Sequence, residues 1–238
     1  MPRVKLKNKM ELAEGTMGFY FEKPPGFQFK AGQFGDWTLI DPPETDAEGN
    51  FRTFTIASAP AEEDLMVATR MRDTAFKRVL RSAPAGTEVE LDGPFGSMAL
   101  HEDRGRPAVF LAGGIGITPF RSMSLQAMRE TQSPRLYLFY SNRRPEDAAF
   151  LSEFVPLEKQ NPGFKLIATM TDLTNSTKAW NGETGHIDGA MLSKYLPDLA
   201  APIYYTAGPP PMVAAMRKML SGAGINAQNI RYEDFVGY

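Results

Sequence analysis

A glycine-rich segment in the middle of the chain constrains the fold more than any other feature of the sequence. Residues 111–119 read LAGGIGITP and join an apolar run to a stretch, 120–128, with apolar residues at helical spacing. This order predicts a buried strand, a tight turn and a helix. Glycines let backbone amides approach a phosphate closely, and the helix N-terminus adds a favourable dipole. The candidate phosphate-binding residues of this turn are Gly113, Gly114, Gly116, Thr118 and Pro119.

The glycine pattern departs from the usual dinucleotide fingerprint, which has a third glycine where this chain has Pro119. Proline suits the first turn of a helix, because its missing amide proton has no partner there in any case. A purely structural turn therefore stays as the alternative interpretation of this segment.

Length and charge exclude several classes of protein. A chain of 238 residues can form one large core or two domains of ordinary size, and its net charge of −2 gives no basic face for nucleic acid. No apolar run reaches the length of a membrane span, and the first residues lack the apolar core of a signal peptide. We expect a cytoplasmic location, with neither nucleic acid nor membrane as partner.

The absence of cysteine excludes whole branches of redox chemistry. Iron–sulfur clusters, thiolate-bound haem, disulfides and thiol nucleophiles all need cysteine, and the sequence has none. His101 and His186 are the two histidines, so a histidine-rich metal site is not expected, and both are predicted in loops or at the surface. We predict no metal, and any electrons must be carried by an organic cofactor.

The two halves of the sequence have different textures. Residues 1–103 contain short alternating runs separated by turns, with one helix from about 74 to 81, as in a small antiparallel β-barrel. Residues 104–238 alternate strand-like and helical runs, which predicts a Rossmann-like parallel α/β sheet. The predicted boundary is the charged, turn-rich segment 101–106. The expected strands of the second half are 109–112, 136–140, 164–170 and 204–207, and the expected helices are 120–130, one from 145, and one ending near 220.

The barrel half contains a candidate ligand-binding strand, Arg52–Ser58. Arginine can grip a diphosphate with a fork of donors, and Phe54 lies on the same side of the strand, where its ring could stack on a flat heterocycle. Thr55 presents a hydroxyl on the other side. A second candidate phosphate site is the helix start at Thr74, although Thr74 could be a helix cap alone.

Five motifs occur in an order that resembles the ferredoxin-NADP reductase family. They span almost the whole chain and lie at residues 52–55, 93–96, 113–119, 208–212 and 233–238. The resemblance implies a flavin-binding barrel followed by a domain that binds a pyridine nucleotide, with FAD held between them. It also implies hydride transfer from NADH or NADPH to FAD, and onward transfer of electrons to a separate acceptor, either a protein or a small molecule.

The resemblance also assigns roles to single residues. Those implied to bind FAD are Arg52, Phe54, Thr55, Thr69, Met71, Thr74, Phe76 and Lys77. The nucleotide is implied to lie against the turn at 113–119, with a second rim formed by Gly208, Pro209 and Met212. Catalytic roles fall to Thr55 beside the flavin, Glu233 as a proton relay and Phe235, which with Tyr238 is a candidate for covering the flavin ring. A surface glutamate at 233, a core phenylalanine at 235 and a frayed end at 238 are the alternatives.

Two positions depart from the family pattern. Phe54 stands where the family usually has tyrosine, and Ala207 stands where many members have cysteine beside the nicotinamide. Ser141, Arg143 and Arg144 follow a predicted strand where an NAD site often has an acid, which favours NADPH. A regulatory protein that keeps the fold without turnover, and a flavin-free dehydrogenase, stay as alternatives, although the second lacks a Tyr-x-x-x-Lys arrangement. The acceptor and the oligomeric state stay open.

Overall fold

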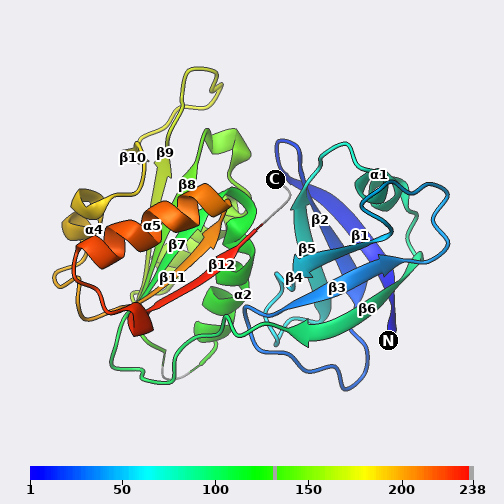
Figure 1. The fold of residues 1–238 in the computed structure, drawn as a ribbon, viewed down its shortest axis with the longest axis horizontal. Coiled ribbons are helices and arrows are strands. Elements are labelled where there is room, and N and C mark those ends of the chain that lie inside the picture. The colour runs from blue at the N-terminus through cyan, green and yellow to red at the C-terminus, as the bar shows by residue number, and fades with distance from the viewer. Residues whose placement is uncertain (131–132, 236–238) are drawn as a thin grey trace.

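The computed structural model describes residues 1–130 and 133–235, and it contains two domains that lie side by side (Figure 1). Each domain is built on a sheet of six strands. The first sheet is antiparallel and the second is parallel, as the sequence predicts.

The antiparallel sheet curls into the predicted barrel. Its strand order is β4-β3-β6-β1-β2-β5, and the two edge strands β4 and β5 contact each other. Side chains alternate between core and solvent, as in β3, because successive residues of a strand point to opposite faces. The strands are β1 (Arg3–Ala13), β2 (Thr16–Glu22), β3 (Phe34–Leu39), β4 (Phe51–Thr55), β5 (Asp64–Arg70) and β6 (Glu88–Phe95).

One helix, α1 (Ala75–Ser82), closes the barrel core. Its apolar face buries Phe76 and Leu80 among the strand side chains, and Trp37 lies in the same cluster. The Thr74 hydroxyl accepts a hydrogen bond of 3.4 Å from the Lys77 amide, so Thr74 is the N-cap. The predicted helix at 74–81 is therefore confirmed to within one residue.

The parallel sheet has helices on both faces (Figure 1). Its order is β10-β9-β8-β7-β11-β12. Alternate residues of the central strands pack in opposite directions, Phe110 and Leu138 towards α2 and α3, Val109 and Phe139 towards α4 and α5. The strands are β7 (Ala108–Gly113), β8 (Leu136–Asn142), β9 (Phe164–Met170), β10 (Glu183–Thr184), β11 (Ile203–Gly208) and β12 (Ile230–Asp234). The helices are α2 (Thr118–Ala127), α3 (Leu151–Gln160), α4 (Gly189–Tyr195) and α5 (Pro210–Gly222).

The helix predicted from residue 145 is wrong at its start. Residues Pro145–Asp147 form a single 3₁₀ turn, and α3 begins only at Leu151. Phe150, which precedes α3, has φ of 63°, a left-handed conformation that interrupts a helix. The prediction began the helix at Pro145, and no turn signal in the sequence indicated the interruption at Phe150.

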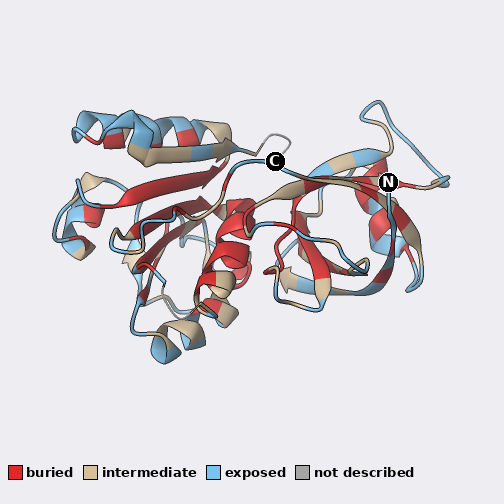
Figure 2. Cartoon of the chain, turned by 90° about the horizontal axis from the view of Figure 1, so that it is seen from below, coloured by how far each residue is buried: buried red, intermediate tan, exposed pale blue. Residues whose placement is uncertain are grey.

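A buried seam joins the two domains. Arg121 of α2 donates a 2.8 Å hydrogen bond to the carbonyl oxygen of Ala57, and the Ser122 hydroxyl donates one of 2.6 Å to the carbonyl oxygen of Ser58. Ala57 belongs to the same apolar cluster as Phe120. Figure 2 shows the central strands of the parallel sheet and the adjoining part of α2 as buried. The candidate strand Arg52–Ser58 is thereby tied to the helix that follows the glycine turn.

His101 lies in the connection between β6 and β7, a loop, which is one of the two locations predicted for it. Its side chain is buried there. Its Nδ1 lies 2.9 Å from the Tyr205 hydroxyl and its Nε2 lies 3.0 Å from the carbonyl oxygen of Arg106. These contacts anchor the connection to β11.

Of the helices in the described ranges, none is both long and apolar enough to cross a bilayer.

Candidate functional site

A cavity of about 540 Å³ opens where the barrel meets the parallel domain. This volume falls in the range of small-molecule sites. The cavity brings together eight of the residues proposed from sequence, Arg52, Phe54, Thr55, Thr69, Lys77, Thr118, Glu233 and Phe235. The sequence placed them in two separate domains, and the fold places them around one space.

Strand β4 supplies the barrel wall of the cavity. The Arg52 guanidinium lies 5.1 Å from the centre of the Phe76 ring, and the Phe54 ring centre lies 5.8 Å from it. Arg52 and Phe54 therefore share one side of the strand, as their spacing predicts. Thr55 is 6% exposed and ends the strand at the cavity.

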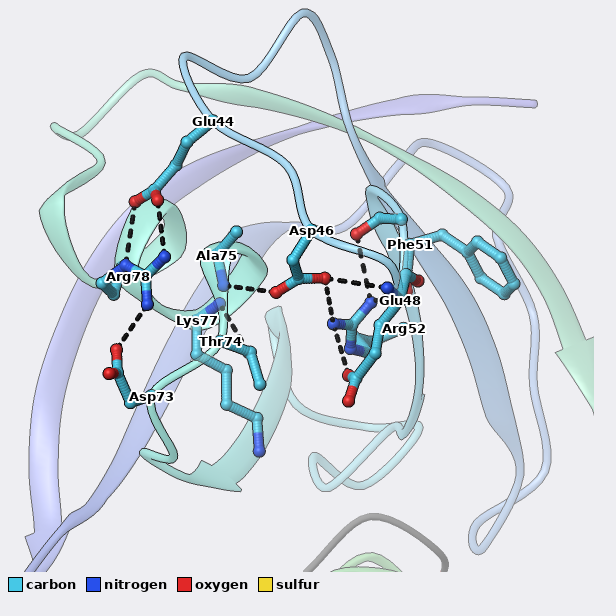
Figure 3. Close-up of polar contacts among 11 residues, drawn as sticks. Glu44, Asp46, Glu48, Phe51, Arg52, Asp73, Thr74, Ala75, Lys77 and Arg78 are labelled. Carbon is cyan, nitrogen blue, oxygen red and sulfur yellow. Dashed lines mark hydrogen bonds and ion pairs between the residues drawn. The ribbon is translucent and has the colours of Figure 1, made fainter.

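The Arg52 guanidinium already has anionic partners from its own loop. It donates to the Glu48 carboxylate at 2.7 Å and lies 3.7 Å from the Asp46 carboxylate. Figure 3 shows Asp46 between the start of α1 and Arg52, and Glu48 beside Arg52. The Arg52 guanidinium expected to bind a diphosphate is thus present, and the Glu48 and Asp46 carboxylates already occupy part of it.

Lys77 is a buried cation of the cavity. The residue is 7% exposed, and in the described part of the chain its amine makes no hydrogen bond or ion pair. Burial, reinforced by the positive charges of Arg72 and Arg52, lowers the pKa of Lys77 to about 8. An anionic group in the cavity would reverse this effect.

The parallel domain contributes an acid to the opposite wall. Glu233 lies on β12, beside Ala207 of β11. Its Oε2 is buried, with no hydrogen-bond partner among the described residues, and burial raises the pKa of Glu233 to about 7. Glu233 lies on the last strand and is partly exposed, so the alternative of a surface glutamate stays open for the rest of its side chain. Phe235 lines the same cavity and packs against the core that contains α2.

The glycines of the turn are needed for packing within the protein itself. A Cβ on Gly113 would lie 2.1 Å from the Met212 sulfur, and a Cβ on Gly116 would lie 2.3 Å from the carbonyl oxygen of Ala207. Gly114 has φ of +53°, and a Cβ there would lie 3.2 Å from the Arg70 guanidinium. The close approach of the turn to β11 and α5 therefore explains two glycines without a ligand.

Several predicted residues lie outside the cavity. Met71 lines a separate small pocket with Gly15 and Arg81, and Phe76 lies in the barrel core, 2% exposed, beneath Arg52. Phe76 thus supports the cavity wall without lining it. The other predicted residues that do not line the cavity are Thr74, Gly113, Gly114, Gly116, Pro119, Ser141, Arg143, Arg144, Gly208, Pro209 and Met212. Tyr238 lies outside the described residues.

The arginines after β8 differ in availability. Arg144 is held by Asp147 at 2.7 Å and by Glu14 at 3.1 Å, so its guanidinium is already paired. Arg143 is exposed, and Ser141 lies at the end of β8 opposite Gly113. The pairing of Arg144 weakens the case that it holds the extra phosphate of NADPH.

Arg70 is the most informative residue that the sequence analysis missed. It ends β5, lines the cavity, and lies over Gly114 of the other domain. No local pattern in the sequence singles it out, because its contact with Gly114 joins residues far apart in the chain. The other lining residues not predicted are Phe34, Glu48, Thr53, Ala68, Ile115 and Asp234.

These residues fit a flavin nucleotide. The uncompensated amine of Lys77 and the arginine fork suit phosphates, and Phe54 offers an aromatic face. The orphaned, buried carboxyl of Glu233 suits a polar edge of a heterocycle. The chain thus offers anion-binding, stacking and proton-carrying groups around one cavity.

Comparison with known proteins agrees with this assignment. Residues 110–218 match the family described as the oxidoreductase NAD-binding domain. A ferredoxin NADP⁺ reductase from Neisseria gonorrhoeae, solved with FAD and NADP bound, superposes with a TM-score of 0.79 over 98% of both chains at 20% identity. The chain has the two-domain fold of a ferredoxin-NADP reductase. The resemblance that the sequence motifs suggested is therefore confirmed, in the two-domain fold and in the nucleotide-binding domain.

Two relatives of this chain have longer sequences. It is 29% identical over 217 residues to the reductase component of propane 2-monooxygenase from Rhodococcus jostii, covering 90% of this chain and 57% of the relative. It is 35% identical over 186 residues to one component of the Na⁺-translocating NADH-quinone reductase of Pseudomonas paraeruginosa, covering 76% of this chain and 44% of the relative. The chain thus spans about half the length of these relatives.

Proposed function

We propose that this chain binds FAD in the cavity between its domains, accepts hydride from a reduced nicotinamide nucleotide, and passes electrons to a separate acceptor. One observation carries the proposal. Cationic and aromatic side chains of the barrel and the buried carboxyl of Glu233 line the same cavity, although they come from opposite ends of the sequence.

Each wall of the cavity has a role in this proposal. Arg52 and Lys77 hold the diphosphate, and Phe54 packs against the flavin. Thr55 holds its hydroxyl near the reacting edge, and Glu233, protonated near neutral pH, supplies or accepts a proton at its buried Oε2. When bound, FAD supplies the hydride-accepting chemistry, and the protein orients the two cofactors and excludes water. Phe235 is proposed to cover the flavin face that the nicotinamide must reach.

For the nucleotide, we propose the turn at 113–119 with Arg70 above it as the binding surface. Arg70 reaches Gly114 from the barrel and lines the cavity, where its guanidinium can pair with a phosphate. We propose NADH as the better donor, because Arg144 is engaged by Asp147 and Glu14. The Pseudomonas relative is named as part of an NADH-quinone reductase, which agrees with this choice.

Steady-state kinetics with the two nucleotides test this preference. The ratio of kcat/KM for NADH to kcat/KM for NADPH is expected to exceed 1, and a ratio below 1 contradicts the proposal.

For the acceptor, we propose a separate redox protein or a small molecule. One relative is named as the reductase component of an oxygenase and another as one component of a quinone reductase. Both names describe proteins that belong to larger electron-transfer systems. The sequence of this chain contains no cysteine to ligate a cluster, so the electrons leave the flavin for a group that these residues do not hold.

The test is an anaerobic titration of the purified protein, loaded with FAD, with NADH. The flavin absorbance band is expected to bleach with about one equivalent of NADH, because one hydride reduces one flavin. Thr55→Val keeps the shape of the side chain and removes the hydroxyl, and should bind FAD with a slower bleach. A protein that binds FAD without bleaching would be a regulatory form of the fold, and one that binds no FAD would overturn the proposal.

A further inference from the structure

Three anion-binding groups converge on one end of the cavity. They are the Arg52 guanidinium, the backbone amides at the start of α1, and the Lys77 amine. Figure 3 shows the Arg52 side chain on one side of Asp46 and the start of α1, with Lys77, on the other. Such a set suits a diphosphate, because one phosphate can lie at the helix start and the other at the guanidinium.

The chain's own acids already hold two of these groups. They belong to residues 44–50, which we name the acidic strap. The Asp46 carboxylate accepts a hydrogen bond of 2.7 Å from the Ala75 amide, at the first residue of α1. This amide holds the pKa of Asp46 below its ordinary value. Asp46 thus sits as an anion at the helix start.

Glu48 makes the matching contact at the guanidinium. Its carboxylate accepts a 2.7 Å hydrogen bond from Arg52, and its backbone carbonyl accepts another of 3.0 Å. Asp46 lies 3.7 Å from the same guanidinium. Two carboxylates therefore stand where the two phosphate groups of a diphosphate would bind.

The carboxylates of the acidic strap do not reach the third anion-binding group, the Lys77 amine. It is buried at the same end of the cavity, and in the described chain no acid pairs with its amine. An amine in this state favours an additional anion, because removal from water without a partner is costly. The strap therefore mimics a diphosphate at two groups and leaves the third for a ligand with more negative charge.

We propose that Asp46 and Glu48 are internal competitors of the flavin diphosphate, so that binding requires the acidic strap to leave Arg52 and the start of α1. The proposal rests on the proposed function, since it assumes FAD in this cavity. The strap is suited to such a movement, because residues 44–48 are exposed and Gly49 has φ of +75° with open space around it. It sets the affinity for the nucleotide and shields the cationic groups before binding.

The first test measures the FAD dissociation constant by quenching of flavin fluorescence on the apoprotein. Asp46→Asn and Glu48→Gln keep the shape and the hydrogen-bond acceptor but remove the charge, and each should tighten FAD binding by about three- to fivefold. Glu44→Gln is the matched control, because Glu44 lies on the same strap but pairs with exposed Arg78. The Glu44→Gln variant should bind FAD with the same affinity as the unmodified chain.

Riboflavin, which has no phosphate, serves as a second control in the same titrations. The charge-removing variants should leave its affinity unchanged. If Asp46→Asn and Glu48→Gln weaken FAD binding or leave it unchanged, the carboxylates do not compete and the proposal is overturned. If they tighten riboflavin as much as FAD, the effect does not involve the diphosphate, and the proposal is equally overturned.

The second test detects the movement directly. Because the chain has no cysteine, spin labels can be placed at Ala47→Cys on the strap and Ser82→Cys at the end of α1, both exposed. Addition of FAD should lengthen or broaden the distance distribution, and riboflavin should not. FAD that binds without moving the strap overturns this inference and leaves the proposed function intact, whereas a protein that binds no FAD overturns both.

Discussion

The Arg121 guanidinium of α2 reaches across the domain boundary and lies 3.1 Å from the Glu62 carboxylate of the barrel. The same guanidinium binds both oxygens of Glu153 at 2.8 Å, and its side chain is only 7% exposed. One buried cation thus joins the barrel, α2 and α3. Since the candidate cavity is lined from both domains, this contact fixes the relative position of its walls.

Loss of Arg121 should therefore destabilise the protein strongly. Arg121→Met leaves the carboxylates of Glu62 and Glu153 without this partner. Because both are partly exposed, we expect a cost of about 3 kcal/mol in the free energy of unfolding, the lower end for a broken buried ion pair. Urea denaturation of the apoprotein measures this. Arg3→Gln is the control, because Arg3 pairs with Glu88 at the surface, and its loss should cost at most about 1 kcal/mol. Equal effects of the two substitutions would contradict the bridging role.

The packing of the glycine turn leads to a second prediction. Gly116→Ala places a methyl group against the backbone of Ala207 and should cost about 1–3 kcal/mol of stability, because the backbone there must shift. Gly163→Ala is the control, since a Cβ at that position meets no atom within 4 Å. Thermal unfolding of the two variants should separate them clearly. A Gly116→Ala protein as stable as Gly163→Ala would show that the turn tolerates a side chain.

Glu233 should make stability depend on pH. Burial raises its pKa from 4.5 to about 7, so the folded protein retains a proton that the unfolded chain releases. The stability of the apoprotein should therefore fall as the pH rises from about 4.5 to about 7 and then level off, as far as this group contributes. Glu233→Gln should remove this component, and melting temperatures at about pH 5 and about pH 8 measure it. A pH dependence unchanged in the variant would place the carboxyl in contact with water.

Lys77 should make the affinity for FAD depend on pH in the alkaline range, above its pKa of about 8. Its pKa of about 8 in the empty cavity should rise when a diphosphate binds, because the anion favours the charged amine. Affinity should thus be full below about pH 8 and decline above it. Fluorescence titration at about pH 7 and about pH 9.5 should show this decline in the unmodified chain and not in Lys77→Met, which should bind more weakly at the lower pH. A decline retained in Lys77→Met would assign it to another group.

The sequence predicts the fold well where periodicity is strong. The strand 164–170 was predicted at its observed bounds, because its apolar residues form a nearly continuous run. The short elements β10 and α4 were missed, since two and seven residues are too few to show a period. Helix α3 was harder to predict, because it contains Pro156, a residue that disfavours the interior of a helix. Its start after the left-handed Phe150 also had no signal in the sequence.

The site was predictable where a motif lies on one strand and not where distant segments meet. Arg52, Phe54 and Thr55 follow from the alternation of β4. Arg70 over Gly114, and Asp46 against Ala75, are contacts between residues far apart in the chain, and no local pattern announces them. The glycines were predicted correctly as a turn, but packing against Met212 and Ala207 accounts for two of them.

The central claim is that FAD lies in the cavity between the two domains, and a crystal structure of the chain with FAD tests it most directly. The account predicts density for the flavin ring between β4 and β12, near Thr55 and Glu233, and for the diphosphate at Arg52 and Lys77. Density for FAD at any other surface, with this cavity free of it, would contradict the account.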